Sequence, residues 1–305
     1  MAVSKPANIA IIGGGLMGHG IAQVFALHGH TVRVYDTAAA VLAALRERVR
    51  QNLAELGQDV QAAERVHPAP LLAQAVADAQ VVFEAGPENL KIKQQLFAEI
   101  EAAAPLTALL SSNTSVIPIT QIMSGLKHRE RALGTHWWNP PYLVPLVEVI
   151  RTAWTSSAAI EQMSSLLTAV GKTPVTVQKD VPGFVGNRLQ HALWREAIAL
   201  VQNGVCDAET VDTVIKASFG RRLAVLGPLE NADLVGTDLT LAIHNTVLPD
   251  LDRTPTALPY LEQLVRDGRL GMKSGEGFRK WTPEQQAALR SKVTAYLKDL
   301  GERGI

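Results

Sequence analysis

The chain has 305 residues, of which 47% are apolar, so it is long enough for one domain of about 150–200 residues and a smaller one. Its 29 basic and 29 acidic side chains give no formal net charge, and we expect no nucleic-acid partner. Cys206 is the single cysteine, which excludes an intramolecular disulfide and favours a reducing compartment. The N-terminus has no signal-peptide pattern, and no segment approaches the roughly 20 apolar residues that span a bilayer. The sequence therefore predicts a cytoplasmic protein without a membrane partner.

Short apolar strands alternate with longer helical patterns through the first half of the chain. The strands are expected at 8–12, 31–36, 81–84, 106–112, 132–136 and 146–150. A helix is expected at about 16–28, and a second at about 38–56, where apolar residues recur every four positions. Strands separated by helices predict parallel crossovers. We therefore expect an α/β fold with a mostly parallel sheet and helices on both of its faces.

The pattern changes after a last strand at 175–178. The motif KDVPG follows this strand, and beyond it only helical patterns occur, beginning with a long helix at 184–201. Residues 282–285 read TPEQ, a capping box with proline at the first helical position, which predicts the start of the final helix. We therefore expect two domains, a sheet domain at 1–182 and an all-helical domain at 183–305.

The turn after the first strand reads GGGLMG and fits the pattern G-x-G-x-x-G. This match is weak alone, but here it lies between a strand and a helix, where dinucleotide binding requires it. Gly13 permits the tight turn, Gly15 lets a pyrophosphate approach the backbone, and Gly18 allows close packing of helix on strand. Leu16 and Met17 begin the helix whose N-terminus faces the phosphates. A glycine turn without a ligand is the alternative, and the agreement of strand, loop and helix argues against it.

Asp36 ends the second strand, 18 residues after Gly18. An acid at this position accepts hydrogen bonds from the adenosine ribose of a dinucleotide. It would repel a 2′-phosphate, and no arginine directly follows Asp36 to receive one. The sequence therefore predicts NAD rather than NADP as the cofactor.

Polar side chains lie at several predicted strand ends, where ligands bind in open α/β sheets. They are Glu84, the run SSNTS at 111–115, and His136. Glu148 lies inside the next strand, between two valines, where an unpaired carboxylate would be costly to bury. If the chain turns back through 139–145, Glu148 returns beside His136, fixes the tautomer of the imidazole and supports its protonated form.

A histidine oriented in this way suits the oxidation of a secondary alcohol with NAD. The hydroxyl proton must leave as the carbon is oxidised, and a group that titrates near neutrality can act as base in one direction and as acid in the other. A core histidine satisfied by the nearest carboxylate is equally compatible with the spacing. The sequence has no H-E-x-x-H and no paired C-x-x-C, so we expect no metal site.

Six motifs, in one order, resemble the L-3-hydroxyacyl-CoA dehydrogenase family across nearly the full chain. They are GGGLMG, PENLKIK, SSNTSVIPIT, GTHWWNPPYLVPLVEVI, DVPGFVGNRL and GMKSGEGF. The resemblance implies a Rossmann-like NAD-binding domain, followed by a helical domain through which subunits usually form homodimers. It also implies NAD-dependent interconversion of an (S)-3-hydroxy compound and its 3-keto partner. The default substrate is then a small molecule, the 3-hydroxyacyl-CoA thioester of fatty acid metabolism.

The resemblance also implies roles for individual residues. His136 is similar to the catalytic base of the family and Glu148 to its partner, while Ser115 and Asn187 resemble the polar groups that hold the substrate oxygen. Further residues resemble positions that contact the cofactor or the substrate beside it: Glu88, Lys93, Asn139 and Lys273. By its position alone, Lys93 would belong to a solvated helix face.

One departure from the family pattern concerns the nucleotide of CoA. Members that act on acyl-CoA tend to carry a longer helical hairpin after the second strand, with serine and lysine contacts to this nucleotide. Here the segment 58–70 is short and interrupted by prolines. Arginines in this region either meet phosphates or form a solvated face, which is the more common case. They are Arg46, Arg48, Arg50 and Arg65.

A second departure is the motif HWWNPP, which replaces the usual HFFNP form. It is similar to relatives that use small substrates without CoA, namely L-carnitine, L-gulonate 3- and pyridine-carboxylate dehydrogenases. Trp137 and Trp138 either wall an aromatic or quaternary-ammonium pocket or pack against the second domain. Two further alternatives are a non-catalytic, crystallin-like protein and a 3-hydroxyisobutyrate-type dehydrogenase, which uses a lysine base.

Overall fold

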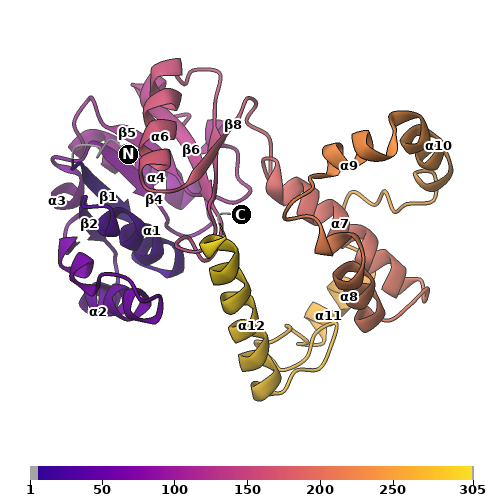
Figure 1. Cartoon of the computed structure of the whole chain (residues 1–305). Coiled ribbons are helices and arrows are strands. Elements are labelled where there is room, and N and C mark those ends of the chain that lie inside the picture. Colours follow the sequence, from indigo (N-terminus) through magenta and orange to yellow (C-terminus); the bar gives the residue numbers. More distant parts are fainter. Residues whose placement is uncertain (1–5, 304–305) are drawn as a thin grey trace. The chain divides into compact units, whose positions relative to one another are not determined.

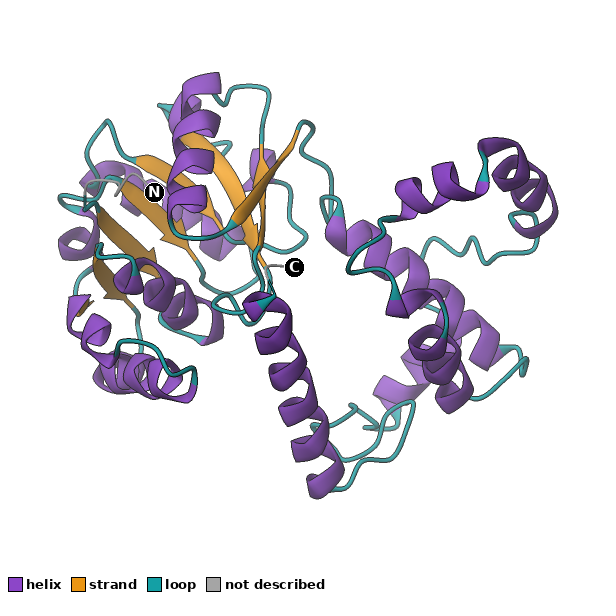
Figure 2. Cartoon of the chain, viewed as in Figure 1, coloured by secondary structure: helices purple, strands orange, loops and turns teal. Residues whose placement is uncertain are grey.

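The computed structural model describes residues 6–303, except for the side chain of Glu302. The chain forms two compact units, Met1–Arg188 and Leu189–Ile305 (Figure 1). The first unit holds the β-sheet, whereas the described part of the second consists of helices, loops and isolated bridges (Figure 2). The predicted α/β class, with a helical region at the C-terminus, is therefore confirmed.

Among the described residues, eight strands form one sheet in the order β3-β2-β1-β4-β5-β6-β7-β8. The strands are β1 (Asn8–Ile12), β2 (Thr31–Tyr35), β3 (Val66–Ala69), β4 (Val81–Glu84), β5 (Leu109–Ser112), β6 (Ala132–Trp137), β7 (Leu146–Ile150) and β8 (Thr173–Val177). All pairs from β3 to β6 are parallel, β7 is antiparallel to β6, and β8 is parallel to β7. The sheet is mostly parallel, as predicted, and only its last two strands are reversed.

Strand β3 was not expected, because its segment contains Pro68 and Pro70. A proline has no N–H to donate to a ladder, so it is tolerated only where no neighbour needs that donor. Strand β3 pairs with β2 alone and lies at the edge of the sheet, which meets this condition. Strand β5 begins at Leu109 rather than at residue 106, after a turn in which the Ala108 N–H donates to Pro105 O (3.0 Å).

Helices cover both faces of the sheet because successive strand residues point to opposite sides. In β1, Ile9 and Ile11 belong to one core layer, and Ala10 and Ile12 belong to the other. The first layer is covered by α1 (Leu16–Leu27), α2 (Ala39–Glu55), η1 (Val60–Arg65) and α6 (Ser157–Ala169). The second layer is covered by α3 (Leu72–Val76), α4 (Leu90–Ala103) and α5 (Ile119–Ile122). A short turn, η2 (Arg129–Arg131), leads into β6.

The described part of the second unit is helical. Its helices are α7 (Gly186–Gln202), which begins in the first unit, α8 (Ala208–Ala217), η3 (Phe219–Arg221), α9 (Pro228–Val235), α10 (Thr237–Val247), α11 (Pro259–Arg266) and α12 (Pro283–Glu302). At the start of α12, the Thr282 hydroxyl accepts from the Gln285 N–H and the Gln285 side chain accepts from the Thr282 N–H, which is the predicted capping box. Within the described residues, no helix has both the length and the apolar character of a membrane span.

Candidate active site of the sheet unit

In the glycine loop between β1 and α1, two glycines lie in close contact with neighbouring main chain. Gly13 has a φ of +106°, and a Cβ there would lie 2.7 Å from the Ala85 carbonyl oxygen. A Cβ at Gly18 would lie 1.7 Å from the Gly13 carbonyl oxygen, so neither position accepts a side chain. At Gly15 nothing lies within 4 Å of an added Cβ. The space beside the N-terminus of α1 is therefore open to a ligand.

The first turn of α1 is available to an anion. Gly15 is the N-cap of the helix and offers no side chain to the first N–H groups, and the first turn holds no acidic residue. Leu16 is exposed, while Met17 packs against the first core layer. Uncapped N–H groups at a helix N-terminus bind phosphate through their hydrogen bonds and the helix dipole. This loop fits the pyrophosphate of a dinucleotide.

Asp36 lies directly after β2 and is bound to the glycine loop. Its Oδ2 accepts from the Gly14 N–H and its Oδ1 accepts from the Ala38 N–H, each at 2.8 Å. A carboxylate oxygen can accept more than one hydrogen bond, so both oxygens keep capacity for the hydroxyl groups of a ribose. The position and the remaining acceptors of Asp36 fit the adenosine half of NAD.

Strands β6 and β7 bring His136 and Glu148 together as direct cross-strand partners. The His136 Nδ1 lies 2.7 Å from Glu148 Oε2, and the two residues are 4% and 1% exposed. The other carboxylate oxygen of Glu148 accepts from the N–H groups of Val185 (2.9 Å) and Gly186 (3.1 Å). The reversed direction of β7 therefore returns Glu148 to the end of β6.

The environment of Glu148 favours its charged form. Burial alone would raise the pKa of Glu148, but the hydrogen bond to His136 and those from Gly186 and Val185 outweigh it and hold this pKa below its usual value. A carboxylate at this position accepts the proton of Nδ1. The Nε2 atom of His136 is then the nitrogen with a free lone pair, which is the form that a general base needs.

The two tryptophans have different surroundings. The Trp138 ring lies 5.2 Å from the imidazole of His136, and it packs so closely against Gly186 that a Cβ there would lie 2.4 Å from Trp138 Cζ2. Trp137 is buried in the first core layer, with its ring 6.0 Å from those of Phe25 and Phe83. The expectation of a pocket wall or a contact with the second domain is thus wrong for Trp137. Side chains alternate along β6, and Trp137 points into the core.

Lys93 is buried rather than part of a solvated helix face. It is 1% exposed, and its ammonium bonds both carboxylate oxygens of Glu84, at 2.8 and 3.0 Å. The Ser112 hydroxyl donates to the same carboxylate at 2.6 Å. The buried side chains of α4 are Lys93, Phe97 and Ile100, a helical spacing that places Lys93 on the core-facing stripe. The carboxylate of Glu84, which binds both the Lys93 ammonium and the Ser112 hydroxyl, therefore joins the ends of β4 and β5.

Glu88 holds the loop after β5. Its Oε1 accepts from the Thr114 hydroxyl (2.6 Å), the Ser115 N–H (3.0 Å) and the Val116 N–H (3.1 Å). Burial acts to raise the pKa of Glu88, but these hydrogen bonds and the charge of Lys93 together outweigh it, so the pKa lies below its usual value. The Ser115 carbonyl oxygen in turn accepts from the Asn187 side chain at 2.8 Å. Glu88, Ser115 and Asn187 thus form one connected group.

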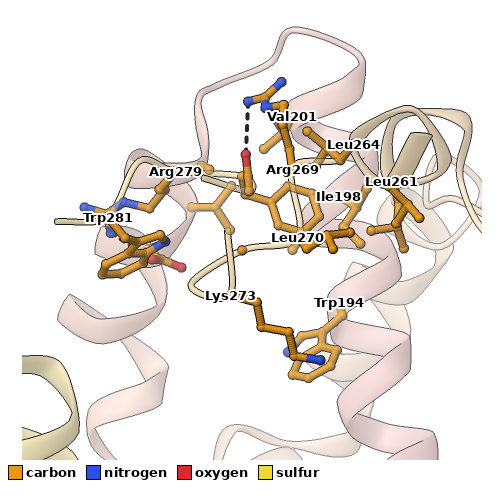
Figure 3. Close-up of a pocket in the computed structure, with 18 residues that line it drawn as sticks. Trp194, Ile198, Val201, Leu261, Leu264, Arg269, Leu270, Lys273, Arg279 and Trp281 are labelled. Atoms are coloured by element: carbon orange, nitrogen blue, oxygen red, sulfur yellow. Dashed lines mark hydrogen bonds and ion pairs between the residues drawn. The ribbon is translucent and has the colours of Figure 1, made fainter. Parts of the chain in front are cut away.

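Asn139 and Lys273 complete the set of predicted site residues. Asn139 is exposed and precedes the cis peptide bond to Pro140, in the loop between β6 and β7. Lys273 belongs to the helical unit, where it lines a cavity of about 640 Å³ together with mostly apolar side chains of α7, α8 and α11. Figure 3 shows the Lys273 side chain extending toward Trp194 of α7. The contact of Lys273 with the cofactor stays a prediction.

Two family models match the chain. The NAD binding domain of 3-hydroxyacyl-CoA dehydrogenase matches residues 8–181, and the C-terminal domain of the same family matches residues 183–281. The chain belongs to the 3-hydroxyacyl-CoA dehydrogenase family. As a member of this family the protein is an NAD-dependent oxidoreductase that acts on CH–OH groups, and its sheet unit is a Rossmann-like domain, as the sequence predicted.

Relatives in this family differ in their substrates. The chain is 37% identical to 5-formyl-3-hydroxy-2-methylpyridine 4-carboxylate 5-dehydrogenase of Mesorhizobium japonicum, over 93% of this chain and 94% of that protein. It is 35% identical to human mitochondrial hydroxyacyl-coenzyme A dehydrogenase, over 90% and 91%. The chain also superimposes on the crystal structure of an NAD⁺-dependent 5-formyl-3-hydroxy-2-methylpyridine 4-carboxylic acid 5-dehydrogenase, with a TM-score of 0.89 at 34% identity. The match covers 97% of each chain. The family assignment therefore leaves the substrate to be argued from the site.

Several residues of the site were not foreseen from the sequence. Val185 and Gly186 act through their N–H groups, for which side-chain identity gives no signal. Asn113 was noted only as part of the SSNTS run, and its Oδ1 accepts from the Trp137 N–H at 2.9 Å. Within the described residues, no group of three histidine, cysteine, aspartate or glutamate side chains is arranged to hold a metal ion.

Proposed function

We propose that this protein oxidises the CH–OH group of a small hydroxy substrate, with His136 as the general base and Glu148 as the residue that orients it. NAD, when bound, accepts the hydride from the carbinol carbon. His136 takes the hydroxyl proton on Nε2, and the imidazolium that results is stabilised by the charged carboxylate of Glu148. The 2.7 Å contact between these two buried side chains is the observation that carries the proposal.

The other predicted residues serve binding in this proposal. Ser115 and Asn187, which are joined by a hydrogen bond, hold the substrate oxygen. The cofactor is held by the glycine loop, Asp36, Glu88 and Asn139. Because the ammonium of Lys93 is buried against Glu84, we propose that Lys93 acts on the cofactor site by fixing Glu84 and Glu88, from which its Nζ lies 2.8 Å and 3.6 Å away.

We further propose that the substrate carries no CoA. Two arginines of α2 that would be candidates for the CoA phosphates, Arg46 and Arg50, are engaged with acids. Arg50 bonds Glu47 and Glu64 at 2.6 Å each, and Arg46 lies 3.3 Å from Glu64. A cation whose charge is already compensated attracts a phosphate less strongly. The indole of Trp138 beside His136 offers a flat surface for an aromatic ring, which agrees with a pyridine carboxylate as the substrate class.

A CoA thioester is the second candidate. The family models and the human relative favour it, because both are named for hydroxyacyl-CoA substrates. The two candidates differ in one large group, the nucleotide of CoA, so a single assay separates them.

A substrate panel tests this choice. NADH formation is measured with (S)-3-hydroxybutyryl-CoA, with free hydroxy acids, and with hydroxymethyl- and formylpyridine carboxylates. The aldehydes belong in the panel because a hydrated aldehyde also presents a CH–OH group. We expect kcat/KM for one free acid to exceed that of the CoA ester by at least about 100-fold. The reverse ranking would establish the CoA thioester as the substrate.

Asp36→Ala tests the cofactor site. Removal of the carboxylate takes away the acceptors for the ribose hydroxyls and the charge that repels a 2′-phosphate. We expect the Kd for NAD to rise by about tenfold, while the Kd for NADP falls. Calorimetric titration of both dinucleotides measures the change, with the exposed Asp59→Ala as a control. A wild-type protein that already binds NADP more tightly than NAD would show that the role given to Asp36 is wrong.

The helical unit is proposed to form a homodimer. Helices α9 and α10 expose many apolar side chains in the single chain: Leu229, Leu234, Leu239, Leu241, Ile243 and Val247. Monomeric proteins rarely expose so much apolar surface, and a two-fold partner would bury it. Sedimentation equilibrium should report about twice the mass of the chain at micromolar concentration. A monomer mass that persists with rising concentration would contradict the proposal.

A further inference from the structure

Lys172 is a buried lysine next to the loop that follows the catalytic histidine. It directly precedes β8 and is 9% exposed. Its ammonium donates to the carbonyl oxygens of Pro141 and Val144, the second at 3.0 Å, and lies 5.7 Å from the ring centre of Trp137. Among the described residues its polar partners are carbonyl oxygens and not carboxylates. Lys172 therefore contacts both the last residue of β6 and the loop that leaves it.

The loop 138–145 lies against the dinucleotide-binding helix. Pro141 packs onto Gly20 of α1, where an added Cβ would lie 2.9 Å from Pro141 Cγ. At its far end, Pro145 O accepts from the Thr173 N–H at 2.9 Å. The loop is thus held between α1 on one side and Lys172 with β8 on the other. It carries Asn139, whose exposed side chain is free to face a ligand.

Burial of an ammonium without an acid is unfavourable for folding. Desolvation lowers the pKa of Lys172 to about 8, so the folded protein holds this proton less firmly than the unfolded chain does. Below this pH the group stays charged in a buried site, which costs stability. A methionine would fill nearly the same volume without that cost. The charge of Lys172 therefore adds nothing to global stability, and what the lysine contributes is its two hydrogen bonds to the loop.

We propose that Lys172 is a positioning residue for NAD: its two hydrogen bonds fix the loop 138–145 against α1 and so place Asn139 for the nicotinamide half of the cofactor. This inference rests on the proposed function, in which Asn139 contacts the nicotinamide or the substrate beside it. The adenosine half is bound by the glycine loop and Asp36, which Lys172 does not contact. Lys172 should therefore affect the binding of the nicotinamide half of the dinucleotide and not that of the adenosine half.

Lys172→Met tests the proposal through binding, without turnover. Calorimetric titration with ADP-ribose reports the adenosine half, and titration with NAD reports the whole cofactor. We expect the affinity for ADP-ribose to stay within about twofold of wild type, while the affinity for NAD falls by about tenfold or more. The unfolding temperature should change little, because relief of the buried charge offsets the loss of the two hydrogen bonds. The exposed Lys179→Met is the matched control and should change neither affinity.

A second variant, Pro141→Gly, loosens the same loop while Lys172 keeps its ammonium and residue 141 keeps its carbonyl oxygen, and it should give the same split between ADP-ribose and NAD. Wild-type affinity for NAD in Lys172→Met would overturn the inference. An equal loss of affinity for both ligands would also overturn it, because a general structural role acts on both halves. Failure of the proposed function looks different, since the wild-type protein itself would then show no tighter binding of NAD than of ADP-ribose.

Discussion

Replacement of His136 by glutamine is expected to lower kcat for substrate oxidation by about 10²–10⁴-fold. Glutamine has a similar length and keeps a polar group next to Glu148, but it cannot take a proton from the substrate. The affinity for NAD should change little, because the glycine loop and Asp36 are untouched. Steady-state rates of NADH formation, together with calorimetric titration of NAD, measure the two effects separately.

His128→Gln is the matched control for this variant. His128 is exposed and lies in the segment before η2, so its replacement should leave kcat unchanged. A near-normal rate for His136→Gln would exclude the histidine mechanism. It would direct attention to a lysine base, as in the 3-hydroxyisobutyrate type of dehydrogenase.

Glu148→Gln is expected to lower kcat by about 10²–10⁴-fold as well. The amide oxygen can still accept from Val185 and Gly186, so the start of α7 stays held. The amide group that faces His136 can no longer stabilise an imidazolium, and it favours the wrong tautomer of the ring. We expect the double variant with His136→Gln to be little slower than either single variant, since the two residues act as one unit.

Glu101→Gln serves as the control for the second variant. Glu101 also accepts from two main-chain N–H groups, those of Lys127 and His128, and its pKa is also lowered although burial acts to raise it. It lies at the end of α4 and takes no part in the proposed chemistry. Loss of rate in Glu101→Gln equal to that in Glu148→Gln would mean that stability, and not orientation of the imidazole, explains the effect.

The pH dependence of folding stability should also reveal the contribution of the Glu148 carboxylate. Its pKa is lowered by folding, so its contribution to stability is complete above the usual carboxylate pKa and is lost as the pH falls through the lowered value. Glu148→Gln removes this part of the acid dependence.

The alternation of strands and helices was readable because most strands are central and apolar on both faces. Strands such as β1 and β4 are continuous apolar runs, as buried parallel strands are. Strand β3 was missed because Pro68 within it and Pro70 directly after it argue against a strand, and only the place of β3 at the edge of the sheet makes Pro68 acceptable. Edge or centre is a property of the whole sheet, and the local sequence does not carry it.

The sequence predicted those parts of the site in which reactive side chains lie at the ends of strands. The sequence placed Glu148 beside His136 on the condition that the chain reverses, and the structure has the two side chains in contact. Lys93 was misread because a lysine on a helix is usually solvated, although its spacing to Phe97 and Ile100 is that of a buried stripe. Lys172 gave no signal, since its partners are the carbonyl oxygens of a loop more than 25 residues earlier.

The pH dependence of kcat/KM for oxidation, compared between wild type and His136→Gln, is the most direct test of the proton transfer. We expect log kcat/KM of the wild type to rise with a slope of one on the acid side, as a single base loses its proton, and then to level off. The slope should be absent from the residual activity of His136→Gln. A variant that keeps the wild-type profile would contradict the assignment of His136 as the base.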